Sequence, residues 1–213
     1  MPVPTVRTLS ISDKVISTLH STQLNEIVGK IDFVIACGDL PYYYQEFIAR
    51  RLRVPLYFVR GNHDPLIEYS ARGDRKAPQG ATNLHARVVH ENGIIFAGVE
   101  GSVRYNDGNF QYTQSEMWGH VLRLVPKLFL NRLRHGRYLD VFVTHASPSG
   151  IHDKPDRTHQ GIQAFNWLLK TFKPKFHFHG HNHVYRNDTI TETQVGETLV
   201  INTYGYKLRE LTF

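Results

Sequence analysis

The chain has 213 residues, of which 41% are hydrophobic and 21% charged, an ordinary composition for a water-soluble globular protein. No apolar run reaches the roughly 20 residues that a membrane-spanning helix needs, and we expect neither a signal peptide nor a membrane partner. The single cysteine, Cys37, excludes an internal disulfide and favours a reducing compartment, most simply the cytoplasm. A formal net charge of +6 favours an anionic substrate or partner without proving one.

The first part of the chain predicts strands that alternate with helices. We expect a strand over residues 6–12 and a helical stretch over roughly 16–29. Short apolar runs at 32–39 and 55–62 are typical of strands that are buried on both faces, and residues 43–52 between them are expected to be helical. This alternation predicts a mostly parallel sheet.

The middle of the chain combines a hairpin with further strands and helices. Two β-rich runs flank a Glu-Asn-Gly turn within residues 84–102, which predicts a hairpin. Residues 114–134 carry apolar side chains at helical spacing. Strands are expected at 140–146 and 175–181, with a helix over 160–172 between them.

The end of the chain, residues 188–213, is expected to form antiparallel strands that turn at a Val-Gly-Glu sequence. No linker and no internal repeat divides the chain. We therefore expect a single domain over residues 1–213.

Each predicted buried strand ends in a side chain that can bind a metal ion. Such a residue by itself is most often a turn or cap residue, but an ordered recurrence at five strand ends is not explained in that way. Ligands of open α/β sheets bind at the carboxyl ends of the strands, so we expect these side chains to converge. Their carboxylate, amide and imidazole groups suit Mn, Fe, Zn or Co ions. The six residues are Asp13, Asp39, Asn62, His145, His181 and His183.

These residues lie in motifs that resemble the signature of the calcineurin-like metallophosphoesterases. The motifs are Gly-Asp at 38–39, Gly-Asn-His-Asp at 61–64, Thr-His at 144–145 and Gly-His-Asn-His at 180–183. The resemblance spans residues 13–183. It implies an α/β fold, a four-layered α/β/β/α sandwich of two mixed sheets flanked by helices, with a centre of two divalent metal ions.

The resemblance also implies how the ligands divide between two metal ions. Asp39 would bridge the ions, and Asp13 with His183 would serve one of them. The other site would be completed by Asn62, His145 and His181. His63 resembles the family histidine that is not a ligand but faces the substrate. In this arrangement His63 is the catalytic residue that protonates the leaving alkoxide or stabilises its charge.

One position departs from the family pattern. The family's first motif is Asp-x-His, whereas Val15 stands at the histidine position here and has no lone pair. The site of Asp13 and His183 is therefore expected to be weak, empty, or completed by another side chain. If the strand continues past Asp13, its period of two places position 15 on the same face as Asp13. The candidates for a replacement ligand are Glu100, His152, Asp153 and His159.

Other polar residues near the motifs are expected to lie around the centre without binding the metal ions. His177 and His179 precede a glycine turn, so we expect them to be strand residues or supports behind the ligands rather than ligands. The segment 101–113 and the loop 147–159 are expected to border the pocket. Arg104, Tyr105 and Asn106 are candidates for contacts to the phosphate or the leaving group.

The function favoured by these features is metal-dependent hydrolysis of a phosphate monoester or diester by a metal-activated hydroxide. The substrate would be a phosphorylated small molecule, a nucleotide or a phosphoprotein. A nuclease variant is an alternative, and it needs basic residues continuous with the active-site cleft. The basic clusters lie at 49–53, 72–76 and 131–137, where solvated helix ends and loops are the simpler explanation. A non-catalytic metal-binding scaffold is the other alternative, which Val15 favours and His63 opposes.

Overall fold

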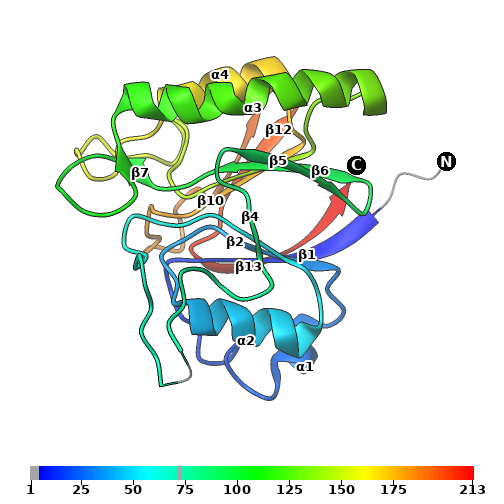
Figure 1. Ribbon diagram of the computed structural model, residues 1–213, viewed down its shortest axis with the longest axis vertical. Coiled ribbons are helices and arrows are strands. Elements are labelled where there is room, and N and C mark those ends of the chain that lie inside the picture. Colours follow the sequence, from blue (N-terminus) through cyan, green and yellow to red (C-terminus); the bar gives the residue numbers. More distant parts are fainter. Residues whose placement is uncertain (1–4, 72) are drawn as a thin grey trace.

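The computed structural model describes residues 5–71 and 73–213. Two β-sheets lie face to face, and a layer of helices covers the outer side of each sheet (Figure 1). This arrangement confirms the predicted α/β/β/α sandwich of two mixed sheets.

The first sheet contains five strands in the order β13–β1–β2–β3–β4. The chain forms β1 (Thr5–Ser12), β2 (Phe33–Ala36), β3 (Leu56–Phe58) and β4 (Thr82–Asn83) as parallel neighbours. β13 (Gly205–Thr212) runs antiparallel to β1 and pairs with it from end to end. Because the parallel strands share one direction, the loops after β1, β2 and β3 leave the sheet at the same edge.

The second sheet contains six strands in the order β11–β12–β10–β9–β6–β5. The inner pairings are parallel, and an antiparallel hairpin closes each edge, which confirms the two predicted hairpins. In chain order the strands are β5 (Arg87–Glu91), β6 (Ile94–Val99), β9 (Val141–Thr144), β10 (Phe176–His179), β11 (Glu192–Val195) and β12 (Thr198–Asn202). A separate pair, β7 (Ser102–Val103) and β8 (Gln111–Tyr112), lies beside this sheet.

Two helices cover each sheet. α1 (Leu24–Val28) and α2 (Tyr42–Leu52) pack on the five-stranded sheet, whereas α3 (Gln114–His135) and α4 (Gln163–Phe172) pack on the six-stranded sheet. A third apolar layer fills the space between the sheets, where the rings of Tyr57 and Phe96 stack with centroids 4.2 Å apart. In the described part of the chain, no helix combines the length and the apolar character that crossing a bilayer requires.

The helix expected over residues 16–29 is much shorter in the structure, because only Leu24–Val28 are helical. The preceding segment is rich in serine and threonine, and the Ser21 hydroxyl donates to the Thr18 carbonyl and accepts from the Gln23 amide. Local bonds of this kind compete with helical hydrogen bonds, so turns replace the first part of the expected helix.

Two details of the elements go beyond the expectations from sequence. The apolar stripe of α3 is narrower than its sequence suggests, since Leu122 and Phe129 are half-exposed while Val121 and Leu128 are fully buried. The terminal strands divide between the sheets, because β11 and β12 join the six-stranded sheet and β13 returns to the other one. The expectation of a single domain over residues 1–213 stays a prediction.

Candidate metal centre

The strand ends of both sheets meet at one edge of the sandwich. Loops after β1, β2 and β3 carry Asp13, Asp39 and Asn62, and loops after β9 and β10 carry His145 and His181. Because the two sheets face each other, residues more than 160 positions apart in sequence come into direct contact. The backbone N–H of His181 donates to both carboxylate oxygens of Asp13, at 3.0 and 3.1 Å.

Close packing of the loops explains the glycines in the motifs. A Cβ atom at Gly61 would lie 1.9 Å from Oδ1 of Asp39, and one at Gly180 would lie 2.5 Å from Oδ2 of Asp13. Asp13, Asp39 and His181 themselves adopt left-handed backbone conformations, with φ of 63°, 55° and 65°. This conformation costs roughly 1–2 kcal/mol for a residue with a Cβ. Such backbone strain is typical of functional sites.

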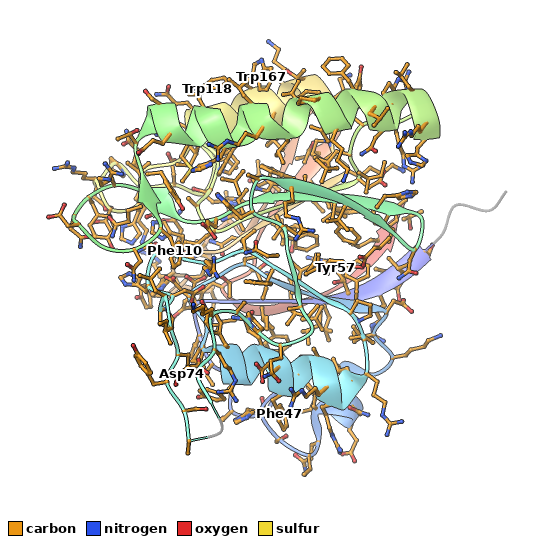
Figure 2. All side chains as sticks on the ribbon, viewed as in Figure 1. Phe47, Tyr57, Asp74, Phe110, Trp118 and Trp167 are labelled. Atoms are coloured by element: carbon orange, nitrogen blue, oxygen red, sulfur yellow. The ribbon has the colours of Figure 1, made fainter. Side chains whose placement is uncertain are left out.

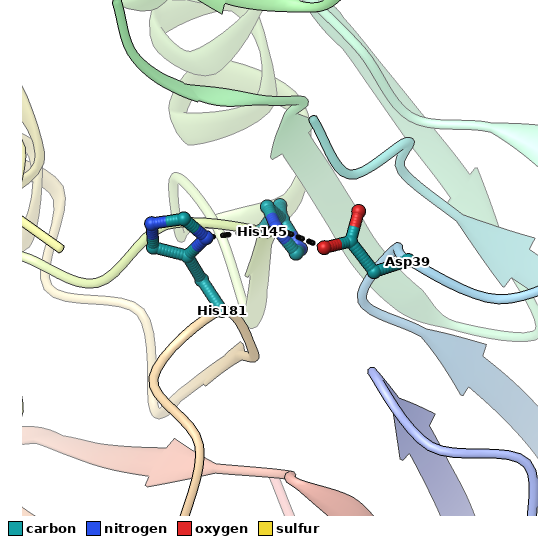
Figure 3. Close-up of side chains that lie close together, drawn as sticks. All are labelled: Asp39, His145 and His181. Carbon is teal, nitrogen blue, oxygen red and sulfur yellow. Dashed lines mark hydrogen bonds and ion pairs between the residues drawn. The ribbon is translucent and has the colours of Figure 1, made fainter. Parts of the chain in front are cut away.

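His145 is held with one ring nitrogen facing a set of hydrogen-bond acceptors. Its Nδ1 lies 2.7 Å from the Cys37 carbonyl oxygen and must donate there, because a carbonyl only accepts. Its Nε2 lies 3.0 Å from Oδ1 of Asn62 and 3.3 Å from Oδ2 of Asp39 (Figure 3). The ring is fully buried.

His181 approaches the same point from the opposite side. Its Nε2 donates to the Thr158 carbonyl at 2.8 Å, which leaves Nδ1 without a proton in the neutral ring. That Nδ1 lies 3.1 Å from Nε2 of His145, and Figure 3 shows both rings in line with the carboxylate of Asp39. One ligand atom from each of these three residues lies within 4.8 Å of the others.

The hydrogen-bond pattern around Nε2 of His145 fits a metal ion better than a proton. Oδ1 of Asn62, Oδ2 of Asp39 and Nδ1 of His181 converge on this nitrogen, yet a single N–H cannot serve three acceptors well. A divalent cation between these four atoms would engage all of their lone pairs. Donation of the other ring N–H to a backbone carbonyl is the usual arrangement of metal-ligating histidines.

The electrostatics of this cluster are those of a buried ion pair. Burial by itself lowers the pKa of His145, but the charge of Asp39 raises it to about 9. Burial raises the pKa of Asp39, and the charge and hydrogen bond of His145 outweigh this and lower it to about 2. Burial and the neighbouring His145 lower the pKa of His181 to about 3. His181 therefore favours the neutral ring, whereas His145 favours a protonated ring beside the Asp39 carboxylate. A cation bound here would take the place of that proton, because a metal-ligating histidine must be neutral.

Asp13 and His183 lie together next to this cluster. Nε2 of His183 is 3.8 Å from Oδ1 of Asp13, and its Nδ1 lies 2.8 Å from the Tyr185 hydroxyl. Burial raises the pKa of Asp13 to about 6. The His183 side chain keeps 38% of its surface accessible to solvent, so this half of the centre is more open than the half formed by the two buried histidines.

The expectation that residue 15 continues the strand face of Asp13 is wrong. β1 ends at Ser12, and the Lys14 amide donates to the Ser12 carbonyl at 2.7 Å, which forms a tight turn instead of an extended strand. Val15 lies beyond this turn with 39% of its surface exposed. The alternation of a strand therefore cannot place the Val15 side chain.

The four candidates for a replacement ligand differ in their surroundings. The ring of His159 lies 5.5 Å from the ring of His181, although its Nδ1 pairs with the Asp156 carboxylate at 2.8 Å. The other three have hydrogen-bond partners that are not among the six predicted ligands: Glu100 bonds to Tyr112, His152 to His179, and Asp153 to the backbone of Gly150 and Gly161.

His63 stands apart from the buried cluster with an exposed side chain. Its backbone N–H donates to Oδ1 of Asp39 at 2.8 Å, and its Nε2 lies 3.5 Å from the Tyr105 hydroxyl. The same hydroxyl accepts a 2.9 Å bond from Nδ2 of Asn62, so Tyr105 connects His63 to a predicted ligand. The carboxylate of the neighbouring Asp64 accepts from the backbone amides of Leu40 and Gly61.

The three residues expected to contact the phosphate or the leaving group have different surroundings. Tyr105 contacts the centre through Asn62 and His63. Arg104 is paired with Glu116 at the start of α3, and Asn106 bonds within its own loop. Tyr105 is therefore the one of the three that the fold connects to the predicted ligands.

The two histidines that were expected to be supporting residues are fully buried behind the ligands. His177 bonds to the Thr144 hydroxyl at 2.8 Å, and His179 lies 2.9 Å from a ring nitrogen of His152. The ring contacts of both histidines are thus with residues outside the predicted ligand set, and Nδ1 of His177 is buried without a hydrogen-bond partner among the described residues.

The carbonyl groups of Cys37 and Thr158 are features of the centre that sequence reasoning does not find. Each accepts the ring N–H that fixes the orientation of a predicted histidine ligand. Every residue carries a backbone carbonyl, so no side-chain pattern distinguishes these two positions.

Comparisons with known proteins agree with this fold. The family model of the calcineurin-like phosphoesterases matches residues 13–185. Among solved structures, the protein TT1561 of Thermus thermophilus is similar, with 16% identity, a TM-score of 0.63 and coverage of 98% of this chain and 99% of that one. GAP50, described as the anchor in the inner membrane complex of Plasmodium, has 12% identity, a TM-score of 0.55 and coverage of 98% and 81%.

These structural likenesses show the fold alone. A search of curated proteins finds no match. The family model spans the loops after β1, β2, β3, β9 and β10, which bring the predicted ligands together. This protein therefore belongs to the calcineurin-like phosphoesterase family.

Proposed function

We propose that this protein is a metal-dependent phosphoesterase that hydrolyses a phosphate monoester or diester. The observation that carries the proposal is that three atoms with lone pairs lie close to Nε2 of His145. Atoms of Asp39, Asn62 and His181 lie 3.0–3.3 Å from that nitrogen. Such a cluster attracts a divalent cation, and phosphoesters are the substrates typical of the family.

In this proposal Asp39, Asn62, His145 and His181 hold one ion. Asp13 and His183 hold the second together with Asp39, which bridges the two. Mn, Fe, Zn or Co fit a donor set of imidazole, carboxylate and amide groups. When bound, the two ions would lower the pKa of a water molecule and neutralise charge on the phosphoryl oxygens.

The residues of the chain supply orientation and a proton. The oxygen of water forms the new bond to phosphorus while the bond from phosphorus to the leaving oxygen breaks. In this proposal His63 gives that leaving oxygen a proton, and the exposure of its side chain supports this role. The Asn62 amide, whose Nδ2 is held by Tyr105, offers its oxygen as a neutral ligand and so preserves positive charge for the phosphate.

Space for a leaving group lies next to these residues. An open hollow of about 220 Å³ is lined by residues that include Asp39, Leu40, His63, Asp64 and Pro65. A small molecule, a nucleotide or a phosphoprotein segment all fit an opening of this kind. We also place the protein in the cytoplasm, where the buried thiol of Cys37 would stay reduced.

The test is metal analysis of the purified protein combined with a panel of nitrophenyl phosphate monoesters and diesters. We expect bound divalent metal and metal-dependent hydrolysis of at least one ester. His145→Ala should lose both, whereas His152→Ala, at a histidine bonded to His179 and Thr193, should retain both. A folded wild-type protein that binds no divalent metal and hydrolyses neither class of ester would contradict the proposal and favour a scaffold.

A further inference from the structure

A row of open hollows leads from the candidate metal centre along the outer side of α2. The hollow beside Asp39 and His63 shares Glu68 with a second hollow of about 460 Å³. The second shares Tyr43 and Arg75 with a third, also of about 460 Å³. Volumes of this size lie within the range of ligand pockets. The hollows therefore form a continuous surface that starts at the centre.

This surface, which we name the α2 track, has a regular arrangement on the helix. Positions 43, 47, 50 and 51 are spaced as i, i+4, i+7 and i+8, so they share one face of α2. Figure 2 shows Phe47 on the side of α2 that points away from the sheets. The track consists of Tyr43, Phe47, Arg50 and Arg51 on α2, with Tyr69 and Arg75 on the following loop.

The charge of the α2 track is positive at its surface. Its two glutamates are engaged at the base, where Glu46 accepts from Nε of Arg75 at 3.1 Å and Glu68 accepts from the Tyr42 amide at 2.7 Å. Arg50 keeps 64% of its side chain exposed although it bonds to Gln79. Arg50 and Arg51 thus have exposed cationic side chains, whereas the Arg75 side chain is 15% exposed and pairs with both glutamates.

The fold brings together two basic clusters that are separate in the sequence. Residues of the 49–53 and 72–76 clusters meet at the α2 track, although Arg72 lies outside the described residues. The third cluster, 131–137, lies at the end of α3, on the far side of both sheets from α2 (Figure 1). Basic charge therefore gathers on the α2 side of the molecule, and the hollow lined by Asp39, Asp64 and Glu68 lies between it and the candidate centre.

Aromatic rings accompany this charge. Tyr69 is 76% exposed and Tyr43 is 45% exposed, although aromatic rings are normally more deeply buried. Exposed rings between arginines form a stacking platform for unpaired bases, with the cations facing the phosphates. A duplex cannot offer its bases to such rings, and a phosphopeptide has no row of bases to stack on them.

We infer that the α2 track binds single-stranded nucleic acid and leads one of its phosphodiesters to the metal centre. The cleavage step rests on the proposed phosphoesterase function, whereas the binding step does not. The 11 residues of α2 span about 16 Å, which is enough for a few nucleotides. The predicted ligand is therefore a short single strand whose affinity falls as salt rises.

The test is fluorescence anisotropy of labelled oligothymidylates of about 2 to 12 nucleotides, which brackets the site size of a short track, measured in EDTA so that no hydrolysis occurs. Tyr69→Ala should weaken binding by about 5- to 150-fold, which corresponds to the loss of one stacked base at about 1–3 kcal/mol. Arg50→Gln should reduce the slope of log affinity against log salt by about 0.7, the value for one lost contact to a single strand. Arg134→Gln removes an exposed charge from α3 and should change neither quantity.

Hydrolysis of a nitrophenyl phosphodiester with added Mn²⁺ is measured in the same preparations and should be equal in all of them. If wild type hydrolyses neither this diester nor a nitrophenyl monoester but binds oligothymidylate through the track, the proposed function fails and the binding inference stands. Equal binding by wild type, Tyr69→Ala and Arg50→Gln would overturn the inference. So would an equal loss in Arg134→Gln, or tighter track-dependent binding of a phosphopeptide of matched charge.

Discussion

At the scale of single residues, the candidate centre contains two buried histidines that are predicted ligands and one exposed histidine, His63, that is the proposed acid. His145 and His181 are packed among acceptors, whereas His63 is tied to the centre through its backbone N–H to Asp39. Replacement of the His63 side chain therefore leaves that bond in place. The ring can be removed without removing a predicted ligand.

His63→Ala should lower kcat by about 10²- to 10⁴-fold, the usual contribution of a general acid, while metal content stays at the wild-type level. Steady-state kinetics and metal analysis of the same preparation check this. Tyr105→Phe is the matched control, because it removes the hydroxyl that lies 3.5 Å from His63 but keeps the imidazole. Loss of metal together with activity in His63→Ala would identify His63 as a ligand.

Val15→His restores the Asp-x-His pattern of the family. This pattern, and not the alternation of a strand, is the reason to expect that the change tightens the weaker metal site. Loss of a residue that hydrogen-bonds to a ligand typically lowers metal affinity by roughly 10–100-fold, and loss of a ligand itself should lower it more. The gain in metal affinity on adding a ligand should therefore exceed that range. Titration with Mn²⁺ should give one tight and one weak or absent event in wild type, and a tightened second event in the variant. Val15→Leu, which adds bulk without a lone pair, should behave as wild type.

Two equally tight events in wild type, with one of them weakened in Val15→His, would mean that another side chain already completes this site. His159 is then the first residue to replace, because its ring lies 5.5 Å from the ring of the predicted ligand His181.

Most residues of the candidate centre could be predicted from sequence, because strand ends, the order of the motifs and the glycines within them are local patterns. Those signals predicted six ligands and His63, and the fold brings these residues to one edge, while their roles stay predictions. The position of Val15 was not accessible, since a left-handed residue at Asp13 ends the strand alternation and no local pattern predicts that conformation there. The role of Tyr105 was only suggested, because its contacts to Asn62 and His63 cross more than 40 residues of sequence.

At the scale of elements, the effect of replacing a glycine depends on whether its loop packs against the candidate centre. Gly61 lies in such a loop, whereas Gly119 lies in α3 with open space around it. Gly61→Ala should destabilise the fold by about 1–3 kcal/mol and reduce metal content, because its Cβ would overlap Oδ1 of Asp39. Gly119→Ala in α3 meets no atom within 4 Å and should stabilise the protein by about 0.5–1 kcal/mol through helix propensity. Urea unfolding and metal analysis of both variants check this pair. Equal stability of Gly61→Ala and wild type would contradict the close approach of the two loops.

The strands could be predicted from sequence where a short apolar run is also fully buried in the fold. The strands at 32–39 and 140–146 have apolar cores, and β2 and β9 lie within them. The segment 16–29 was mispredicted because local side-chain bonds override helical tendency. The placement of β13 was beyond local reasoning, since pairing with β1 is a contact between the two ends of the described chain.

At the scale of the whole molecule, a buried neutral histidine makes stability depend on pH. Burial holds the pKa of His177 well below 6.5, and the charges of His179 and His152 lower it further. Because the folded pKa is below the unfolded pKa, protons bind preferentially to the unfolded chain. This contribution to stability is complete above about pH 6.5 and declines at lower pH by about 1.4 kcal/mol per unit.

Unfolding by urea at pH values of about 7, 6 and 5, which span the unfolded pKa of histidine, should therefore show a smaller pH dependence for His177→Asn than for wild type, whatever the absolute stability of the variant. Asparagine retains a polar group for Thr144 but does not titrate. His20→Asn replaces an exposed imidazole and should have the pH dependence of wild type. The same pH dependence in His177→Asn and wild type would contradict the prediction.

The pairing of β1 with β13 has a consequence for synthesis of the protein on the ribosome. Asp13 emerges early, yet the strand that precedes it obtains its antiparallel neighbour only when residues 205–212 emerge. The amide of His181, which holds the Asp13 carboxylate, also emerges late. We therefore expect the Asp13 carboxylate to lack this partner for most of elongation, and the candidate centre to be complete only after translation of β13. Ribosome-bound chains arrested before residue 205 should accordingly bind metal far more weakly than released protein.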